Sequence, residues 1–197
     1  MKNGVTINVY RGEEIRPFID HLANLRMSIF REYPYLYDGD KAYEADYLKT
    51  YSECEHSLMV IAFSEDQLIG ASTAIPLEFE THACQKPFIA HNMDVEKIFY
   101  FGESLLLPQY RGQHIYRHFF EKREEAAREY GATISAFCAV KRDENDARRP
   151  KNYKPLDSVW RHFGYEEHPE LCAYYEWREV GEAKMSEKPL IFWLKKL

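Results

Sequence analysis

The segment from Tyr100 to Gly131 constrains this chain more than any other, because it reads as a strand, a tight turn and a helix in succession. It begins as an almost unbroken apolar and aromatic run, then passes Pro108 and a turn at Arg111-Gly112. In the helical part, apolar side chains recur every three or four residues and charged side chains fill the other positions. We therefore expect a helix that packs against a sheet with one face in water.

The turn in this segment is predicted to bind an anion. The first turn of a helix has about four N–H groups without intrahelical partners and roughly half a positive charge. Gly112 lets a ligand approach the backbone closely, and Arg111 and Arg117 add full positive charges. A phosphate or a pyrophosphate is the expected guest.

The turn also carries a recognisable motif, Gln109-Tyr110-Arg111-Gly112-Gln113-His114, preceded by Leu106-Leu107-Pro108. It resembles the acetyl-CoA signature of the GNAT N-acetyltransferase superfamily, which is Gln or Arg, two residues, Gly, one residue, then Gly or Ala. The strand before the motif, the helix after it and the later segment from Trp160 to Tyr165 are similar too, so the resemblance covers most of the chain. It implies that acetyl-CoA is a co-substrate.

The resemblance also implies which residues bind the CoA thioester. Backbone groups of Leu105, Leu106 and Leu107 would pair with the pantetheine arm and polarise the thioester carbonyl, while their side chains are core. The other implied residues lie in the loop, in the first turn of the following helix and in a later short helix. They are Gln109, Arg111, Gly112, Gln113, His114, Ile115, Tyr116, Arg117 and Trp160.

Two residues of the motif region depart from the family pattern. His114 stands where the family usually has Gly or Ala, and Tyr116 stands where many members have a further Gly. These side chains could crowd the pyrophosphate, or they could point away and leave the backbone donors free. The sequence leaves both outcomes open.

Hydrophobic periodicity places the other elements and predicts one domain spanning residues 1–197. Their order is β-α-α-β-β-β-α-β-α-β-β, an α/β fold with a mixed central sheet flanked by helices, and it is similar to that of the GNAT superfamily. The stretch 78–96 is expected to be irregular because of Pro87 and its mixed composition. Outside the central segment we expect strands at 5–10, 57–63, 68–77, 133–140, 171–180 and 189–197, and helices at 13–30, 43–53 and about 157–163.

Composition excludes several classes of function. The net charge of −6 gives no basic surface for nucleic acid. The four cysteines form no CxxC pair, and the scattered histidines, including His114 and His118, match no metal-site spacing, so no metal is expected. No apolar run approaches the ~20 residues of a membrane helix, and no signal peptide is seen, so we expect a cytoplasmic protein without a membrane partner.

One carboxylate is predicted to act in catalysis. Glu103 lies in the buried strand, where a charge costs several kcal/mol unless partners compensate it. In a GNAT-like fold this strand faces the acceptor amine, so Glu103 is a candidate general base, acting directly or through a water. The alternative is that Glu103 is paired with an arginine from a neighbouring loop. Trp160 stands where many family members have a thiolate-protonating Tyr, which leaves Ser104 and Tyr153 as weak substitutes for that role, or water as the proton source.

A tyrosine-rich loop is the candidate acceptor site. Tyr33, Tyr35, Tyr37 and Asp38 offer aromatic faces and negative charge to a cationic amine, such as a small metabolite. The alternative is a solvated acidic loop whose tyrosines pack on the core. Later in the chain, the basic stretch 141–154 could contact cofactor phosphates or an acidic partner, although a solvated charge run is favoured.

These observations lead to two hypotheses of function. The first is an acetyl-CoA-dependent N-acetyltransferase that moves an acetyl group directly to a primary amine of a small molecule or a protein. The second is a catalytically inactive GNAT-like module that binds CoA or serves as a sensor or scaffold. A homodimer is left open, because the apolar segment Ile191-Phe192-Trp193-Leu194 could extend a partner's sheet or pair internally.

Overall fold

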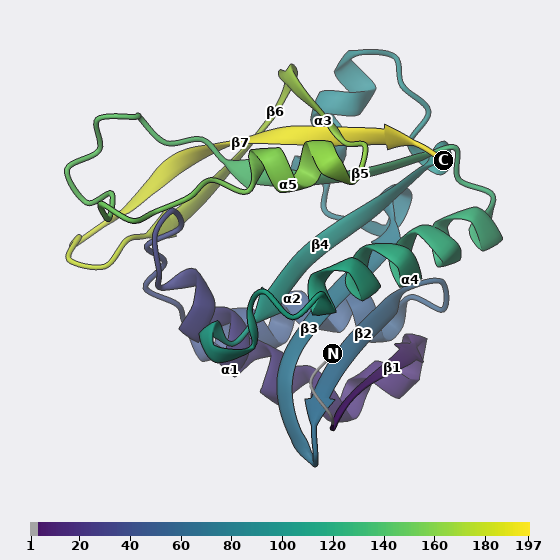
Figure 1. Ribbon diagram of the computed structural model, residues 1–197. Helices are drawn as coiled ribbons and strands as arrows, with labels where there is room; N and C mark the ends of the chain where they lie inside the picture. The colour runs from purple at the N-terminus through teal and green to yellow at the C-terminus, as the bar shows by residue number, and fades with distance from the viewer. Residues whose placement is uncertain (1–3) are drawn as a thin grey trace.

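The computed structural model describes residues 4–197, and residues 1–3 of the predicted domain lie outside them. A seven-stranded sheet runs through the molecule in the order β1-β2-β3-β4-β5-β7-β6 (Figure 1). The strands are β1 (Val5–Arg11), β2 (Leu58–Ser64), β3 (Gln67–Pro76), β4 (Ile98–Leu106), β5 (Ile134–Val140), β6 (Glu166–Arg178) and β7 (Met185–Lys196). The α-helices are α1 (Ile19–Phe30), α2 (Lys41–Glu53), α3 (His82–Ala90), α4 (Ile115–Tyr130) and α5 (Asp157–His162).

The predicted mixed sheet and element order are confirmed, with two corrections. The segment 13–30 is not one α-helix, because Gly12–Phe18 forms a 3-10 helix before α1. Pro17 cannot donate a backbone hydrogen bond, so the regular α-helical ladder begins only after it. The stretch 78–96 is not irregular throughout, since α3 forms despite Pro87. Its Phe88 ring packs 4.6 Å from that of Phe192, and this core contact outweighs the weak local propensity.

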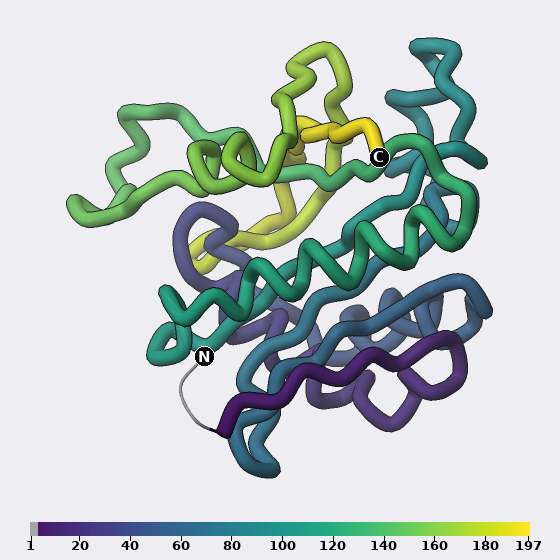
Figure 2. The backbone as a smooth tube through the Cα atoms, turned by 45° about the vertical axis from the view of Figure 1, so that its right-hand side comes forward, coloured from purple at the N-terminus to yellow at the C-terminus, as the bar shows by residue number. Residues whose placement is uncertain are grey.

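Helices cover both faces of the sheet (Figure 2). Leu22 of α1 and Leu48 of α2 are fully buried against one face, in a core that includes Leu105. Phe119 of α4 is fully buried against the other face, together with Phe101. Strand β4 lies between these two cores, so its alternate side chains enter opposite sides of the molecule.

The two central strands diverge. In the described part of the chain, β4 and β5 are parallel and paired only where Ile98, Phe99 and Tyr100 meet Ile134, Ser135 and Ala136. Beyond these pairs β4 continues beside β3 alone, while β5 continues beside β7. Figure 1 shows the V-shaped opening that results between the C-terminal halves of β4 and β5. The sheet therefore presents unpaired backbone groups of β4 at its centre. No helix in residues 4–197 combines the length and apolarity needed to cross a membrane.

Candidate active site

The loop from β4 to α4 stands at the mouth of the opening between β4 and β5. A single 3-10 turn, Pro108–Tyr110, leads to Gly112, which has φ +75°. A Cβ on Gly112 would meet nothing within 4 Å, so it is the backbone conformation that favours glycine here. Helix α4 begins at Ile115, and its first N–H groups open toward this loop. The predicted strand, turn and helix are all present.

The loop side chains leave much of this backbone uncovered. Arg111 turns back toward β4, where its Nε donates to the Leu106 carbonyl at 3.2 Å and its Nη2 contacts Glu32 at 3.2 Å. Gln113 Nε2 donates to the Gln109 carbonyl at 3.2 Å. The other loop side chains are exposed at His114 and at Arg117. An anion at the helix start would therefore meet backbone donors first.

His114 and Tyr116 behave differently. His114 is the residue before α4 and has φ +64°, a left-handed conformation that costs a residue with a Cβ more than it costs glycine. Tyr116 turns toward α5, and its hydroxyl accepts a hydrogen bond from Trp160 Nε1 at 3.1 Å. The Tyr116 ring also packs on Phe120 and Phe163, at centroid distances of 5.2 and 6.3 Å. Tyr116 therefore links α4 to α5.

The leucines that precede the loop are divided between the two cores. Leu105 is fully buried on the α1 and α2 side, whereas Leu106 and Ile115 are buried on the α4 side. Leu107 packs on both, and its backbone N–H donates to the Ile69 carbonyl at 2.9 Å. The predicted core role of these side chains agrees with their burial.

Glu103 lies on the α1 and α2 face of β4, at an irregularity in the pairing of β3 with β4. Its carboxylate is almost fully buried, accepts a hydrogen bond from Thr73 Oγ1 at 2.7 Å and pairs with Arg26 of α1. Arg26 also pairs with the fully buried Glu44 of α2. The charge on Glu103 is thus compensated by an arginine, but one from a helix and not from a loop.

Further polar groups extend this network beyond Arg26. Glu80 is buried and accepts hydrogen bonds from Tyr47 and Tyr51, at 3.0 and 2.9 Å. Burial raises the pKa of Glu80 despite these bonds. The Arg26 guanidinium lies 4.9 Å from the centroid of the Tyr47 ring and also contacts Phe30. Buried carboxylates and tyrosines thus surround one arginine.

Sequence reasoning missed Arg26, Tyr47, Tyr51 and Glu80. For Arg26 a signal was available, because it occurs within the apolar stripe of α1, one position after Leu25 and three before Ile29. A charged side chain on a buried helix face requires a partner. Nothing in the sequence indicates that the partners are on β4 and α2.

The tyrosine-rich loop lies between α1 and α2 and is attached to the end of β6. Tyr37 forms a bridge with Glu179, and the Asp38 N–H donates to the Arg178 carbonyl at 2.9 Å. The Asp38 carboxylate pairs with Arg31 and with Arg178, at 2.8 Å each, and its pKa is lowered by the hydrogen bond from Arg31. Its negative charge is therefore largely committed within the protein.

The tyrosine rings of this loop have unequal surroundings. Tyr35 packs on Phe30 at 4.5 Å between centroids, and burial raises its pKa. Tyr33 meets Tyr153 edge to face at 4.7 Å. Burial also raises the pKa of Tyr37. The structure brings Tyr153 beside this loop, whereas Ser104 lies on β4 against α4.

The basic stretch 141–154 is not simply a solvated charge run. Arg142 and Arg148 both pair with the buried Glu179, with Arg142 Nη1 at 2.6 Å from its carboxylate. Burial alone would raise the pKa of Glu179, but hydrogen bonds from these arginines hold it below its usual value. Arg142 also donates to the Pro34 and Tyr35 carbonyls at 2.6 and 2.9 Å. The sequence could not show this, because Glu179 is distant along the chain.

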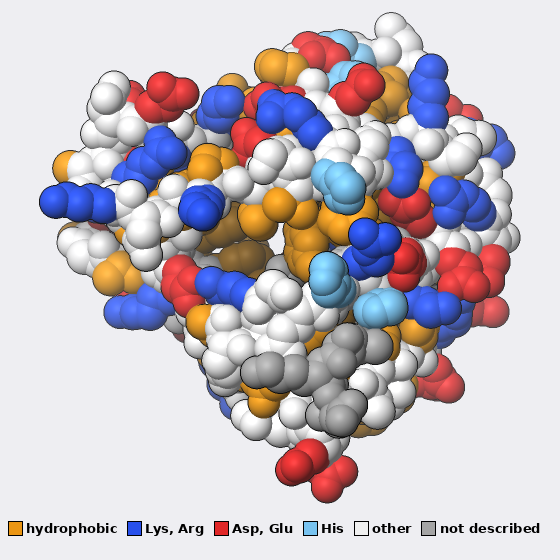
Figure 3. Space-filling view, viewed as in Figure 1, with side chains coloured by type: hydrophobic (Ala, Val, Ile, Leu, Met, Phe, Trp, Pro, Cys, Tyr) orange, Lys and Arg blue, Asp and Glu red, His pale blue; other side chains and the backbone are white. Residues whose placement is uncertain are grey.

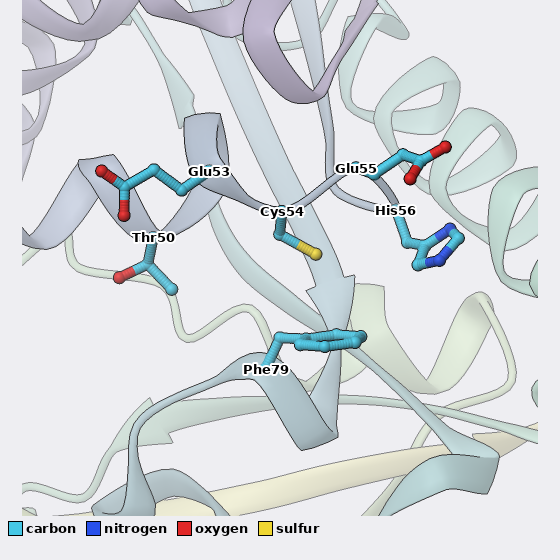
Figure 4. A pocket seen from close by; sticks show the side chains of 6 residues that line it. All are labelled: Thr50, Glu53, Cys54, Glu55, His56 and Phe79. Carbon is cyan, nitrogen blue, oxygen red and sulfur yellow. The ribbon is translucent and has the colours of Figure 1, made fainter.

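The surface is hollowed beside the start of α4. Figure 3 shows a hollow lined by hydrophobic side chains between α5 and the start of α4, with Lys and Arg side chains over the loop between β5 and α5. The His56 ring packs on Tyr130 at the end of α4. A separate pocket lies between the end of α2, His56 and Phe79 (Figure 4). It is lined by Thr50, Glu53, Cys54, Glu55, His56 and Phe79. Within residues 4–197 no three His, Cys, Asp or Glu side chains are grouped as a metal site would require.

Comparison with solved structures identifies the fold as that of the GNAT acetyltransferases. Ribosomal-protein-alanine N-acetyltransferase from Brucella melitensis matches with a TM-score of 0.61 and 15% identity, over 98% of this chain and 99% of that chain. The yncA protein of Salmonella typhimurium, solved with its cofactor acetyl-CoA, matches with a TM-score of 0.59 and 10% identity, over 99% and 95%. A GNAT-family protein from Desulfovibrio desulfuricans matches with a TM-score of 0.57 and 10% identity, over 97% and 99%.

The resemblance is thus carried by structure and not by overall sequence. No protein-family model matches the sequence, and no match is found among curated proteins. The predicted GNAT-like fold is confirmed across nearly the whole chain.

Proposed function

We propose that this protein is an acetyl-CoA-dependent N-acetyltransferase that transfers the acetyl group directly to a primary amine. The observation that carries the proposal is the juxtaposition on β4. The strand leaves β5 after Tyr100, carries the buried carboxylate Glu103, and ends at a loop whose helix start offers open backbone donors. A thioester and an amine could meet in this opening, between an anion site and a base.

The residues of the loop fit the phosphates of CoA. Gly112 has the positive φ and the open space that a close approach to the backbone requires. The start of α4 supplies N–H donors and the positive end of the helix dipole. Arg117 is exposed beside it and adds charge. Backbone groups of β4 near Ser104, which have no β5 partner, would hold the pantetheine arm, whereas the Leu106 carbonyl already accepts from Arg111.

Glu103 would act as the general base, directly or through a water. An ammonium has no lone pair, so the amine must lose a proton before it attacks the thioester carbonyl carbon. Thr73 and Arg26 hold the Glu103 carboxylate in one orientation. Arg26 supplies the positive charge that offsets the cost of burying this carboxylate.

The acceptor would reach Glu103 from the side of the loop between α1 and α2. Tyr33, Tyr35 and Tyr37 place aromatic surface there, and aromatic faces attract cations. We propose an acceptor with a primary amine, in a small cationic molecule or in a protein. The structural neighbour from Brucella melitensis is named for a protein alanine.

The proposal is tested by binding and by turnover. Acetyl-CoA at ~100 times its dissociation constant should stabilise the protein by about 2.7 kcal/mol, seen as a rise in melting temperature. Free thiol should then appear when a panel of amines, diamines, amino sugars and N-terminal peptides is added. The absence of a shift in melting temperature at millimolar acetyl-CoA would contradict the proposal.

The substitution Glu103→Gln tests whether Glu103 is the general base. It should lower kcat by about 10²- to 10⁴-fold, because proton removal from the amine is lost. Glu187→Gln is the matched control, because Glu187 is exposed on β7. Unchanged kinetics in Glu103→Gln would remove Glu103 from the mechanism. The melting shift with acetyl-CoA should be the same in all three proteins.

A second candidate function is a non-catalytic CoA-binding or sensor module. It is favoured by the Tyr116 side chain, which bonds to Trp160 across the space between α4 and α5, and by the strained His114. A melting shift with acetyl-CoA but no thiol release across the amine panel would favour this reading.

A further inference from the structure

Arg123 of α4 is an unusual feature of the α4 face of β4. It is only 2% exposed, and its guanidinium lies 4.4 and 5.0 Å from the ring centroids of Phe101 and Phe120. Its three donor contacts all go to neutral oxygen atoms. They are the carbonyl of Phe119 at 3.0 Å, the carbonyl of Glu103 at 3.1 Å and the Ser104 hydroxyl at 2.8 Å.

No carboxylate of residues 4–197 forms an ion pair with Arg123. Burial lowers the pKa of Arg123, and Tyr116, Tyr165, Glu103 and Glu124 offset this only in part. A buried charge without a counter-ion costs several kcal/mol. A neutral side chain of similar size could fill the same space between two aromatic rings. The stability of the fold alone therefore gives no reason for a cation at this position.

The groups that Arg123 contacts lie at the opening between β4 and β5. Ser104 follows the last β4 residue paired with β5 by four positions. The Ser104 hydroxyl accepts from Arg123, and the Arg123 guanidinium and the Tyr116 ring both pack on Phe120, at 5.0 and 5.2 Å. Burial raises the pKa of Tyr116, and the hydrogen bond from Trp160, the Arg123 charge and Ser104 offset this only in part. On its other side the Tyr116 hydroxyl accepts from Trp160. The four side chains connect α4, β4 and α5 at this opening.

The hydrogen-bond donors and acceptors of these groups determine in which direction a proton can pass. Trp Nε1 can only donate, so its bond occupies a lone pair of the Tyr116 oxygen and leaves the phenol proton for another acceptor. Arg123 likewise can only donate, and its charge favours negative charge nearby. The arrangement thus suits a group that gives up a proton and becomes anionic for a short time.

We infer that Tyr116 protonates the departing CoA sulfur and that Arg123, through Ser104, stabilises the negative charge that develops there. The inference rests on the proposed function. As the amine nitrogen bonds to the thioester carbonyl carbon, the C–S bond breaks and sulfur takes its electron pair. The Tyr116 phenol proton passes to this sulfur. The resulting phenolate regains a proton from the one removed from the amine, through Glu103 or solvent, so atoms and charges balance.

Trp160 and Tyr116 have different parts in this step. The hydrogen bond from the Trp160 indole orients the Tyr116 phenol. Tyr116 is the catalytic residue, and Arg123 and Trp160 are positioning residues.

The test compares leaving groups. Tyr116→Phe should lower kcat with acetyl-CoA by about 10²-fold or more, while KM for acetyl-CoA changes by less than about threefold. With two truncated thioesters, S-acetyl-N-acetylcysteamine and S-(4-nitrophenyl) thioacetate, the defect should persist for the first and disappear for the second. The aromatic thiolate is a weak base and leaves without a proton. A purely structural role would give equal defects with both.

Arg123→Met supplies the matched variant, because it keeps an unbranched side chain between Phe101 and Phe120. Its kcat with acetyl-CoA should fall by about tenfold, with the same dependence on leaving group, and Arg123→Lys should recover part of the rate. The inference is overturned if Tyr116→Phe stays within twofold of the unmodified protein, or if its defect is independent of the leaving group. If the unmodified protein releases no thiol from any thioester, the proposed function itself fails, and the inference fails with it.

Discussion

Two arginines lie on opposite faces of β4, and their charges have different kinds of partner. Arg26, on the α1 side, pairs with the buried carboxylates of Glu44 and Glu103. Arg123, on the α4 side, contacts only neutral oxygen atoms. Burial lowers the pKa of both, but Glu103 and Glu44 raise that of Arg26 above its usual value, whereas the pKa of Arg123 remains lowered. The charge of Arg26 is thus neutralised by neighbouring carboxylates, whereas the charge of Arg123 has no carboxylate partner among residues 4–197.

Under the proposed function, the difference would serve two separate tasks at one strand. Arg26 would offset the burial of the carboxylate that is to accept the proton from the amine. A departing thiolate needs positive potential without a competing anion, and an uncompensated arginine supplies it. Removing the two arginines should therefore have opposite consequences for stability and for rate.

The largest expected effect is on stability, in Arg26→Met. Loss of Arg26 leaves two carboxylates buried without a cation, which costs about 3–5 kcal/mol in the free energy of unfolding. Urea denaturation followed by tryptophan fluorescence measures it. Arg26→Lys should recover only part of the loss, because one ammonium cannot match the fork that contacts both carboxylates. A cost below about 1 kcal/mol would show that the two buried carboxylates do not depend on Arg26 for a counter-charge, and the comparison would fail.

Arg123→Met should change stability much less. It removes a buried charge that has no counter-ion, and this gain offsets the lost hydrogen bonds and aromatic contacts. The free energy of unfolding should stay within about 1.5 kcal/mol of the unmodified protein. The same denaturation experiment measures it. A cost as large as that of Arg26→Met would mean that Arg123 is a structural residue, and the contrast between the two arginines would be lost.

The sequence predicted the fold better than it predicted this contrast. Periodicity and the turn around Gly112 identified β4, the loop and α4, because each is encoded by neighbouring residues. Arg123 was visible in the sequence only as one more charge on an amphipathic helix. Its burial depends on the rotation of α4 against β4, which is set by contacts such as that of Phe119 with the sheet. Glu103, in contrast, was singled out because it interrupts an apolar run.

The acceptor side shows the same limit. The tyrosines at 33, 35 and 37 were correctly placed in one loop, but their partners come from distant parts of the chain. Arg142 and Glu179 are held together only by the folded sheet, so the spacing of basic residues could not reveal that pair. Local patterns thus identify elements and individual unusual residues. Which charges meet is decided by tertiary packing.

A change in the loop before α4 tests whether the strain at His114 is separate from the two arginines. His114→Gly should raise the free energy of unfolding by about 1 kcal/mol, because φ +64° costs nothing for glycine. His114→Ala, which keeps a Cβ, should gain much less. The gain should be unaltered in the Arg123→Met background, as expected for independent sites. Equal effects of glycine and alanine would instead point to the imidazole ring, and not to backbone strain.

The smallest expected effect concerns a third arginine, which shows what a pair contributes when it is exposed. Arg148 is 44% exposed and contacts Asp146 at 2.8 Å as well as Glu179. Hydrogen bonds from Arg148 lower the pKa of Asp146 to about 2. This depressed pKa gives stability that is present above the unfolded-state pKa of about 4 and is lost as the pH falls toward about 2.

Because solvent screens the pair, Asp146→Asn should lower the melting temperature near pH 7 by less than about 2 °C. The difference from the unmodified protein should narrow as the pH is lowered below about 4. A difference that is constant with pH would show that the Asp146 charge is not involved, and that Arg148 is held by Glu179 alone.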